Sequence, residues 1–217
     1  MAHIYPSLMA ADPLNLGSVI KKLDPIAHGY HLDVMDFHFA PNLTLGISTV
    51  NAIGQASTRP VWVHLMVDNP LPYFPRFELP AGTTITVHIE ITTDMRQAIR
   101  LINERKWNAG IAISPKTNIQ RVMPYVEYIN QVLIMGVEPG FSGQAFLPDV
   151  ISKIEPIVGF RNTSGIDFKI AMDGGISAAN IPQLQEKGVE QFAVGAEIFN
   201  TDSIVKNLES LEALLGN

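Results

Sequence analysis

The sequence contains no cysteine among its 217 residues. This absence excludes disulfide scaffolds, thiolate metal sites and cysteine nucleophiles together. Any metal site in this protein must therefore be built from histidine and carboxylate side chains.

Charged residues are also scarce, because they make up 17% of the chain against about 25% in a typical soluble domain. Much of the chain is therefore expected to be buried. The 15 Lys and Arg residues are outnumbered by 21 Asp and Glu residues, which gives a formal net charge of -6. A negatively charged chain repels a polyphosphate backbone, so we expect no nucleic-acid partner.

Long hydrophobic runs are absent as well. No apolar stretch approaches the roughly 20 residues that span a bilayer. Residues 1–6 do not begin the basic and then apolar pattern of a secretory signal. We therefore expect no association with membranes and a cytoplasmic location. A chain of 217 residues suits a single α/β barrel, so residues 1–217 are expected to form one domain.

The sequence does contain a regular alternation of strand-like and helix-like segments. Short apolar runs rich in β-branched residues are each followed by turn residues and then by a polar segment with helical spacing. The predicted strands cover residues 3–8, 29–35, 60–67, 83–90, 109–114, 131–137, 168–173 and 191–195. The predicted helices cover residues 14–27, 47–56, 71–77, 93–106, 118–127, 148–159, 178–187 and 203–215.

Eight such pairs predict an α/β protein with a single (β/α)8 TIM barrel. The third helix is expected to be short or irregular, because it contains Pro72 and Pro75 and follows Pro70. The alternative fold is an open doubly wound sheet, which usually has fewer strands and a glycine-rich turn after the first one. Here the first strand ends in Pro6-Ser7-Leu8-Met9 without such a turn, and this favours the barrel.

Polar side chains occupy otherwise apolar strand ends, where barrel enzymes carry their chemistry. Side chains alternate along a strand, so His31 and Asp33 share one face of the second predicted strand. His64 lies on the third strand, and Asp173 ends the seventh. Taken singly, each could be a hydrogen-bonded core histidine or a turn-forming aspartate. Together they favour a shared site, because a buried carboxylate is costly unless it is paired or binds a metal.

Two imidazoles and two carboxylates form a ligand set that suits one divalent Zn²⁺, Fe²⁺, Mn²⁺ or Co²⁺ ion. The set is too rich in nitrogen for a Ca²⁺ site. His88 and Glu90 on the fourth strand have the same i, i+2 spacing. They could be further ligands or, instead, hydrogen-bonded supports for the first four. The remaining histidines show no pattern and are assigned to the surface or to structural roles: His3, His28 and His38.

Glycine-rich segments follow the last three predicted strands. They are Gly140-Phe141-Ser142-Gly143-Gln144, Gly174-Gly175 and Gly195-Ala196, and none of them contains Lys or Arg. Glycines let backbone N–H groups approach an anion closely, and barrels often bind phosphate at these last loops. The segments therefore indicate either a phosphate site made of backbone amides or ordinary turns.

Longer motifs occur in order along nearly the whole chain. They are Pro6-Ser7-Leu8 with Ala11-Asp12, His31-Leu32-Asp33-Val34-Met35-Asp36, His38-Phe39 with Pro41-Asn42-Leu43-Thr44-Leu45-Gly46, His64-Leu65-Met66-Val67 with Asn69-Pro70, Glu138-Pro139-Gly140-Phe141-Ser142-Gly143-Gln144 with Phe146, and Asp173-Gly174-Gly175-Ile176. In these motifs and their spacing the chain resembles the ribulose-phosphate 3-epimerase family.

The resemblance implies a barrel of the ribulose-phosphate-binding type, with a divalent metal on His31, Asp33, His64 and Asp173. It also implies that Asp33 and Asp173 are the catalytic acid/base pair. The residues that it places around the substrate, with the phosphate on the glycine loops, are Ser7, Met35, His64, Met66, Met135, Gly140, Gly143, Gly174, Gly175, Gly195 and Ala196.

This chain also departs from the family pattern. Phe37 stands where the family has Gly, and Ala196 stands where Ser is frequent, so a hydroxyl that could contact the phosphate is lost. Ser114 precedes Pro115 where Asn is usual, and Gly136 replaces a common Ser or Thr. None of these departures removes a metal ligand.

The resemblance implies an isomerase of carbohydrate metabolism that acts on a small ketose phosphate. The first hypothesis is 3-epimerisation of D-ribulose 5-phosphate to D-xylulose 5-phosphate, the pentose phosphate reaction, by two-base proton transfer through a metal-stabilised enediolate. The same chemistry on D-allulose 6-phosphate and a sugar-phosphate-binding protein without catalysis remain alternatives. A decarboxylase of the orotidine-phosphate type is excluded, because no Lys lies between Asp33 and Asp36. The metal and the oligomeric state stay open, and a homo-oligomer is compatible with the sequence.

Overall fold

A computed structural model describes residues 1–200 and 203–216 and arranges eight parallel strands as a ring. They are β1 (His3–Pro6), β2 (Tyr30–Met35), β3 (Val61–Met66), β4 (Thr84–His88), β5 (Asn108–Ile113), β6 (Gln131–Met135), β7 (Lys169–Asp173) and β8 (Gln191–Val194). The sheet has the order β1-β8-β7-β6-β5-β4-β3-β2. An isolated bridge between Ser7 and His31 joins its two ends. The barrel is thus nearly closed, and the predicted (β/α)8 fold is confirmed.

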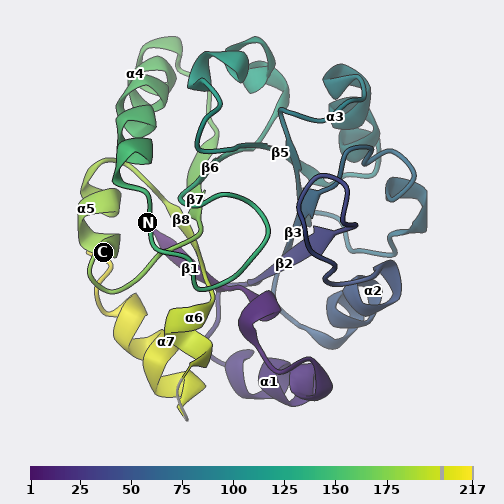
Figure 1. Cartoon of the computed structure of the whole chain (residues 1–217), viewed down its shortest axis with the longest axis vertical. Coiled ribbons are helices and arrows are strands. Elements are labelled where there is room, and N and C mark those ends of the chain that lie inside the picture. Colours follow the sequence, from purple (N-terminus) through teal and green to yellow (C-terminus); the bar gives the residue numbers. More distant parts are fainter. Residues whose placement is uncertain (201–202, 217) are drawn as a thin grey trace.

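Helices surround the ring of strands (Figure 1). The α-helices among the described residues are α1 (Leu16–Leu23), α2 (Ile47–Ala56), α3 (Met95–Glu104), α4 (Ile154–Ser164), α5 (Ile181–Glu186), α6 (Ala196–Phe199) and α7 (Ile204–Glu212). Short 3-10 helices supplement them: η1 (Leu8–Ala10), η2 (Pro13–Asn15), η3 (Phe74–Arg76), η4 (Ile119–Arg121), η5 (Met123–Tyr128) and η6 (Pro148–Lys153).

The α-helix predicted over 118–127 is wrong, because this stretch forms the two 3-10 helices η4 and η5. Pro124 lies within it, and proline both lacks a backbone N–H and disfavours an α conformation in the residue before it. The segment 71–77 contains only η3, the short turn that its prolines implied. The segment 148–159 begins as η6 and becomes α4.

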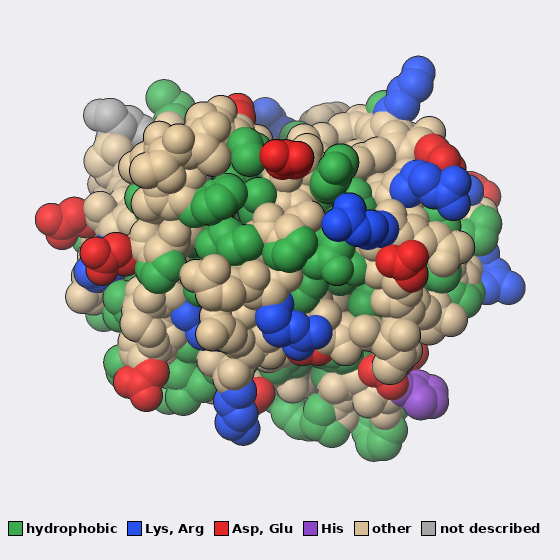
Figure 2. Space-filling view, turned by 90° about the horizontal axis from the view of Figure 1, so that it is seen from above, with side chains coloured by type: hydrophobic (Ala, Val, Ile, Leu, Met, Phe, Trp, Pro, Cys, Tyr) green, Lys and Arg blue, Asp and Glu red, His purple; other side chains and the backbone are tan. Residues whose placement is uncertain are grey.

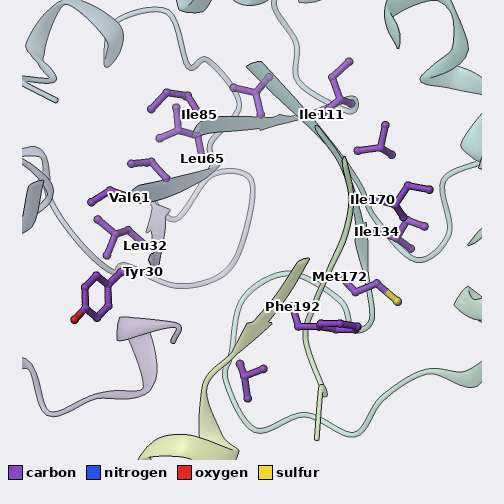
Figure 3. Close-up of a cluster of buried hydrophobic side chains, with 14 of the residues drawn as sticks. Tyr30, Leu32, Val61, Leu65, Ile85, Ile111, Ile134, Ile170, Met172 and Phe192 are labelled. Carbon is purple, nitrogen blue, oxygen red and sulfur yellow. The ribbon is translucent and has the colours of Figure 1, made fainter. Parts of the chain in front are cut away.

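Apolar side chains on the outer face of the strands form the main core against the helices. Figure 3 shows members of this cluster radiating from the strands: Tyr30, Leu32, Val61, Leu65, Ile85, Ile111, Ile134, Ile170, Met172 and Phe192. Full burial of one such side chain contributes about 1.5–3 kcal/mol. Helix α3 shows how the sequence supplies the matching surface, since it buries Ala98, Ile99 and Ile102. Asp94 precedes the helix as its N-cap, and its carboxylate accepts the N–H of Arg96.

The inside of the barrel is filled by side chains as well. Trp62 Nε1 donates to Thr86 Oγ1 at 2.8 Å, and Thr86 Oγ1 donates to Gln131 Oε1 at 2.6 Å. Gln131 Nε2 donates to Gln191 Oε1 at 2.8 Å, and Gln191 in turn donates to the Tyr5 hydroxyl at 3.2 Å. These bonds satisfy polar groups in the interior, so the barrel is a packed core with its polar site confined to one end.

The surface carries charges of both signs. On the face seen in Figure 2, Lys and Arg side chains are interspersed with Asp and Glu, and apolar side chains lie between them. Among the helices of residues 1–200 and 203–216, none has the length and apolar character needed to cross a bilayer.

Candidate functional site

Four polar side chains meet where β2, β3 and β7 approach their carboxyl ends. Asp33 on β2 is the register partner of His64 on β3, and Asp173 is the last residue of β7. His31 lies two residues before Asp33 and therefore shares its face of the strand. Each of the four presents one ligand atom, and these atoms all lie within 4.8 Å of one another. The convergence expected from the sequence is thus observed.

His64 lies between the two carboxylates. Its Nδ1 is 3.5 Å from Asp33 Oδ1 and 3.4 Å from Asp173 Oδ2. The other oxygen of Asp33 accepts a 2.8 Å hydrogen bond from Ser7 Oγ and lies 3.2 Å from His31 Nδ1. Asp33 is therefore held through its Oδ2 atom. Asp173 is the more exposed carboxylate, with 13% of its side chain accessible against 4% for Asp33.

The imidazoles and carboxylates of this cluster shift one another's pKa values. Burial opposes the ionisation of Asp33, but the imidazoles of His31 and His64 outweigh burial and hold the pKa of this carboxyl well below its usual range. Burial also opposes protonation of His64, yet the nearby carboxylates of Asp173 and Asp33 raise its pKa to about 9. Without a metal ion, the site therefore holds a protonated imidazole between two carboxylates at neutral pH.

Two imidazole nitrogens fit the role of metal ligands. His31 Nε2 and His64 Nδ1 are buried, and neither has a hydrogen-bond partner of normal geometry among the described residues. Buried polar atoms without partners are costly, so they need an explanation such as a bound ion. The His/Asp group could bind a divalent cation, which would replace the proton of His64, and its mixed nitrogen and oxygen donors suit a transition metal.

A cavity opens above this cluster and contains most of the residues predicted to surround the substrate. Those that line it are Ser7, Asp33, Met35, Met66, Met135, Gly140, Gly143, Asp173, Gly174, Gly175, Gly195 and Ala196. His64 was also placed around the substrate, but it is fully buried and does not line the cavity. The two carboxylates thus face the same space, while the imidazoles lie outside its lining.

The cavity also has lining residues that the sequence did not reveal. Met9, Ser177 and Glu197 belong to them. Glu197 lies in the first turn of α6, a helix too short to give a periodic pattern, and its carboxylate accepts the N–H of Ala178 at 3.3 Å. Their positions directly after predicted strand ends or glycine loops were the only signal in the sequence.

The glycine loops are close-packed against one another. A Cβ on Gly175 would stand 2.7 Å from backbone atoms of Phe146, and the residue has φ +67°. A Cβ on Gly136 would stand 2.2 Å from the carbonyl oxygen of Gly174, which explains why this chain has no larger residue there. Gly136 and Gly175 are therefore required by the packing of these loops.

Phe37, which replaces a glycine of the family pattern, keeps the glycine-like backbone. Its φ is 68°, in the left-handed region, and its side chain is 64% exposed. The turn is held by the Phe37 N–H, which donates to the Asn42 carbonyl, and by a bridge between Asp36 and Leu43. Phe37 does not line the cavity, so the substitution leaves the lining of the site unchanged.

His88 and Glu90 support the cluster and are not part of the ligand group. His88 Nε2 lies 2.9 Å from His64 Nε2, on the ring edge away from the carboxylates, and His88 Nδ1 lies 3.1 Å from Glu90. Burial lowers the pKa of His88 to about 4. Although burial opposes its ionisation, Glu90 has a pKa lowered to about 2 by its contacts with His88.

The other histidines have the peripheral roles expected of them. His3 and His28 pack ring against ring, with centroids 3.9 Å apart, and His28 lies 3.8 Å from Glu212. His38 is mostly exposed beside Asp36.

Comparison with known sequences gives a consistent result. A sequence model of the ribulose-phosphate 3 epimerase family matches residues 3–199. A ribulose-phosphate 3-epimerase of Mycobacterium leprae is 35% identical over 199 residues, which cover 90% of this chain and 87% of that protein. The ribulose-phosphate 3-epimerase of Aquifex aeolicus is 32% identical over 216 residues, covering 99% and 97%. That of Escherichia coli is 31% identical over 214 residues, covering 98% and 95%.

Solved structures with the same fold are more distant in sequence. KGPDC from Streptococcus mutans superposes with a TM-score of 0.69 at 12% identity and covers 98% of this chain and 96% of that one. A mutant tryptophan synthase alpha-subunit from Pyrococcus furiosus superposes with a TM-score of 0.69 at 16% identity, with full coverage of both chains. At such identities the superpositions show the shared barrel alone.

Proposed function

The chain belongs to the ribulose-phosphate 3-epimerase family, and on this premise we propose that it is an isomerase interconverting D-ribulose 5-phosphate and D-xylulose 5-phosphate. The observation that carries the proposal is the pair of carboxylates, Asp33 and Asp173, which face one cavity beside two buried imidazoles. Family membership supplies the substrate class, and the carboxylate pair supplies a chemistry that suits it.

Epimerisation next to a ketone requires two groups that exchange protons on opposite faces of the substrate. One carboxylate removes the C3 proton, which leaves a planar enediolate, and the other delivers a proton to the opposite face. Asp33 and Asp173 are the candidates for these roles, because they project from different strands into the same cavity. Ser7 supports the arrangement by donating a hydrogen bond to Asp33, which fixes one of its oxygens.

His31, Asp33, His64 and Asp173 would hold one divalent ion, for which Zn²⁺, Fe²⁺, Mn²⁺ and Co²⁺ are the candidates. Such an ion supplies Lewis-acid stabilisation of the negative charge that develops on adjacent substrate oxygens. His64 must give up the proton on Nδ1 to act as a ligand, and its Nε2 remains bonded to His88.

The rest of the cavity suits the two ends of a ketose phosphate. Met35, Met66 and Met135 form an apolar wall that excludes water from the reacting carbons. No Lys or Arg occurs among the described residues that line the cavity, so backbone amides of the glycine loops are the proposed phosphate donors. Ser142 also offers a hydroxyl, since its Oγ lies 3.4 Å from where a Cβ on Gly195 would stand.

The proposal is tested by loading the purified, metal-depleted protein with each candidate ion in turn. Turnover of D-ribulose 5-phosphate and of D-allulose 6-phosphate is then compared, together with exchange of the C3 hydrogen in deuterated water. We expect exchange and epimerisation of the pentulose phosphate at a higher kcat/KM than the hexulose phosphate. A metal-loaded protein that binds the pentulose phosphate without C3 exchange would instead be a binding protein.

A further inference from the structure

A line of buried hydrogen bonds leads from the metal-ligand group into the barrel wall. His64 Nε2 contacts His88 Nε2 at 2.9 Å, and His88 Nδ1 contacts Glu90 Oε2 at 3.1 Å. Both histidine side chains are 0% exposed, and their ring planes are inclined by only 17°. Strands β3 and β4 and the turn after β4 thus place His64, His88 and Glu90 in series behind the site.

The end of this line is anchored to the backbone. The second oxygen of Glu90, Oε1, accepts the N–H of Ser114 at 2.9 Å. The loop that carries Ser114 is held in turn by Lys153, whose ammonium donates to the carbonyl oxygens of Ser114 at 2.8 Å and Thr117 at 2.6 Å. Glu90 therefore has a fixed position and uses one oxygen for each partner.

Proton positions along the line follow from its donors and acceptors. Two imidazole nitrogens in contact share a single proton, so one must donate and the other accept. An ionised Glu90 can only accept, which places the proton of a neutral His88 on Nδ1 and leaves its Nε2 as an acceptor. A neutral His64 must then carry its one proton on Nε2, so Nδ1, the nitrogen beside Asp33 and Asp173, presents a lone pair once its own proton has left.

We infer that His88 and Glu90 are positioning residues that set the tautomer and ring orientation of His64, so that Nδ1 is the metal-binding nitrogen. This inference rests on the proposed function only in taking His64 as a metal ligand. Outer carboxylate–histidine contacts of this kind commonly change metal affinity by 10- to 100-fold when they are removed. His88 and Glu90 do not line the cavity, and His64 is the metal-ligand residue to which His88 is hydrogen-bonded.

Glu90→Gln is the most direct test. The glutamine amide has one acceptor and one donor end, so it cannot accept from both Ser114 and His88. If the amide oxygen accepts from Ser114, the amide NH2 group faces His88 Nδ1 and donates to it. His88 must then donate from Nε2 to His64, which reverses the direction of both hydrogen bonds. We expect the variant to bind Zn²⁺ and Co²⁺ 10- to 100-fold more weakly than the unmodified protein in a titration without substrate. In the zinc-loaded protein, ¹⁵N spectra of labelled histidine are expected to show a changed His88 tautomer.

His88→Phe provides a second route, because it keeps the ring shape and removes the acceptor for His64 Nε2. Thr86→Val is the matched control, because Thr86 lies on β4 as the register partner of His64. Its hydroxyl is hydrogen-bonded to Trp62 and Gln131 and not to His64. The control is expected to lower thermal stability while leaving metal affinity and histidine tautomers unchanged. Unchanged metal affinity in both Glu90→Gln and His88→Phe would overturn the inference.

The metal titration also separates this inference from the proposed function. If the protein binds metal through His64 but does not epimerise a pentulose phosphate, the proposed function fails and the positioning role is still measurable. If the protein is an active epimerase and its metal affinity is unchanged in both Glu90→Gln and His88→Phe, the positioning role fails and the function stands.

Discussion

At the scale of single residues, two adjacent buried histidines have pKa values displaced in opposite directions. Burial opposes protonation of His64, yet the carboxylates of Asp173 and Asp33 raise its pKa to about 9. Burial lowers the pKa of His88 to about 4. Below pH 6.5 the raised pKa of His64 contributes its full stabilisation, which is lost as the pH rises to 9. The lowered pKa of His88 stabilises the fold above pH 6.5, and this is lost as the pH falls to 4.

These two histidines predict that the metal-free protein is most stable near pH 6.5. On the alkaline limb of the pH profile, from pH 6.5 to 9, and on its acid limb, from pH 6.5 to 4, the free energy of unfolding is expected to fall by an amount on the order of a few kcal/mol. Urea unfolding after exhaustive chelation measures it. Saturating Zn²⁺ is expected to remove the alkaline limb, because the ion takes the place of the proton on His64 Nδ1. His88→Phe should remove the acid limb. A metal-free unfolding free energy that stays flat between pH 6.5 and 9 would contradict the assignment to His64.

Phe37 is a second residue-scale feature, because a left-handed backbone at a non-glycine residue costs about 1–2 kcal/mol. Phe37→Gly removes that strain but gives the unfolded chain more freedom, so a net gain of about 0.5–1 kcal/mol in the free energy of unfolding is expected. Phe37→Ala keeps the Cβ and should show no gain. Urea unfolding of the pair checks this, and a glycine variant no more stable than the alanine variant would contradict backbone strain at Phe37.

At the scale of secondary-structure elements, strands were more predictable than helices. Each predicted strand overlaps an observed one, because strands of a barrel are covered on both faces and read as continuous apolar runs. The helices lie at the surface, where local chemistry decides between α and 3-10 turns. Pro124 and Pro148 therefore lie in segments that form the 3-10 helices η5 and η6 where longer helices are predicted. The four residues of α6 are too few for a helical period to appear.

The loops after β6, β7 and β8 are expected to bind the phosphate, so a bulkier residue there should weaken substrate binding. Gly195→Ala places a Cβ 3.0 Å from that of Ala10 and 3.4 Å from Ser142 Oγ, so it narrows the approach to the backbone amides. We expect KM for the sugar phosphate to rise about 10-fold, or about 1.4 kcal/mol, with a smaller change in kcat.

Lys116→Ala is the matched control for the loops. Its ammonium lies 2.9 Å from the cavity residue Glu138, so it tests whether a nearby cation supplies the affinity. KM should change by less than about 3-fold if backbone amides hold the phosphate. A larger effect in Lys116→Ala than in Gly195→Ala would contradict amide binding.

At the scale of the whole molecule, the two carboxylates, Asp33 and Asp173, are far apart in the sequence and meet because the barrel closes. Each is expected to serve one face of the substrate, so each handles the C3 hydrogen of one epimer. Asp33→Asn and Asp173→Asn should both abolish epimerisation and retain slow C3 exchange for opposite epimers. The measurement is deuterium uptake by each pure epimer with metal content determined in parallel. Metal-loaded variants that interconvert the epimers at near the unmodified rate would refute the two-base assignment.

The members of the site could be predicted from the sequence, but their arrangement could not. Polar residues within apolar strand ends identify Asp33, His64 and Asp173, because burial of such side chains is costly unless they are partnered. The ring orientation of His64 and its contact with His88 depend on strand register and barrel closure. The fit of Gly175 against Phe146 likewise depends on how two loops meet.

The packed interior beneath the site has a kinetic consequence. Because Trp62, Gln131 and their partners fill the barrel beneath the site, residues 1–200 and 203–216 leave a ligand the mouth of the cavity as its way in and out. Substrate and product of an epimerase have the same size, charge and phosphate, and they would compete for this single entrance and the same binding position. Each molecule must depart before the next arrives, so the catalyst would slow as its own product accumulates. The net rate of epimerisation would then be set by the reaction that consumes one of the two epimers.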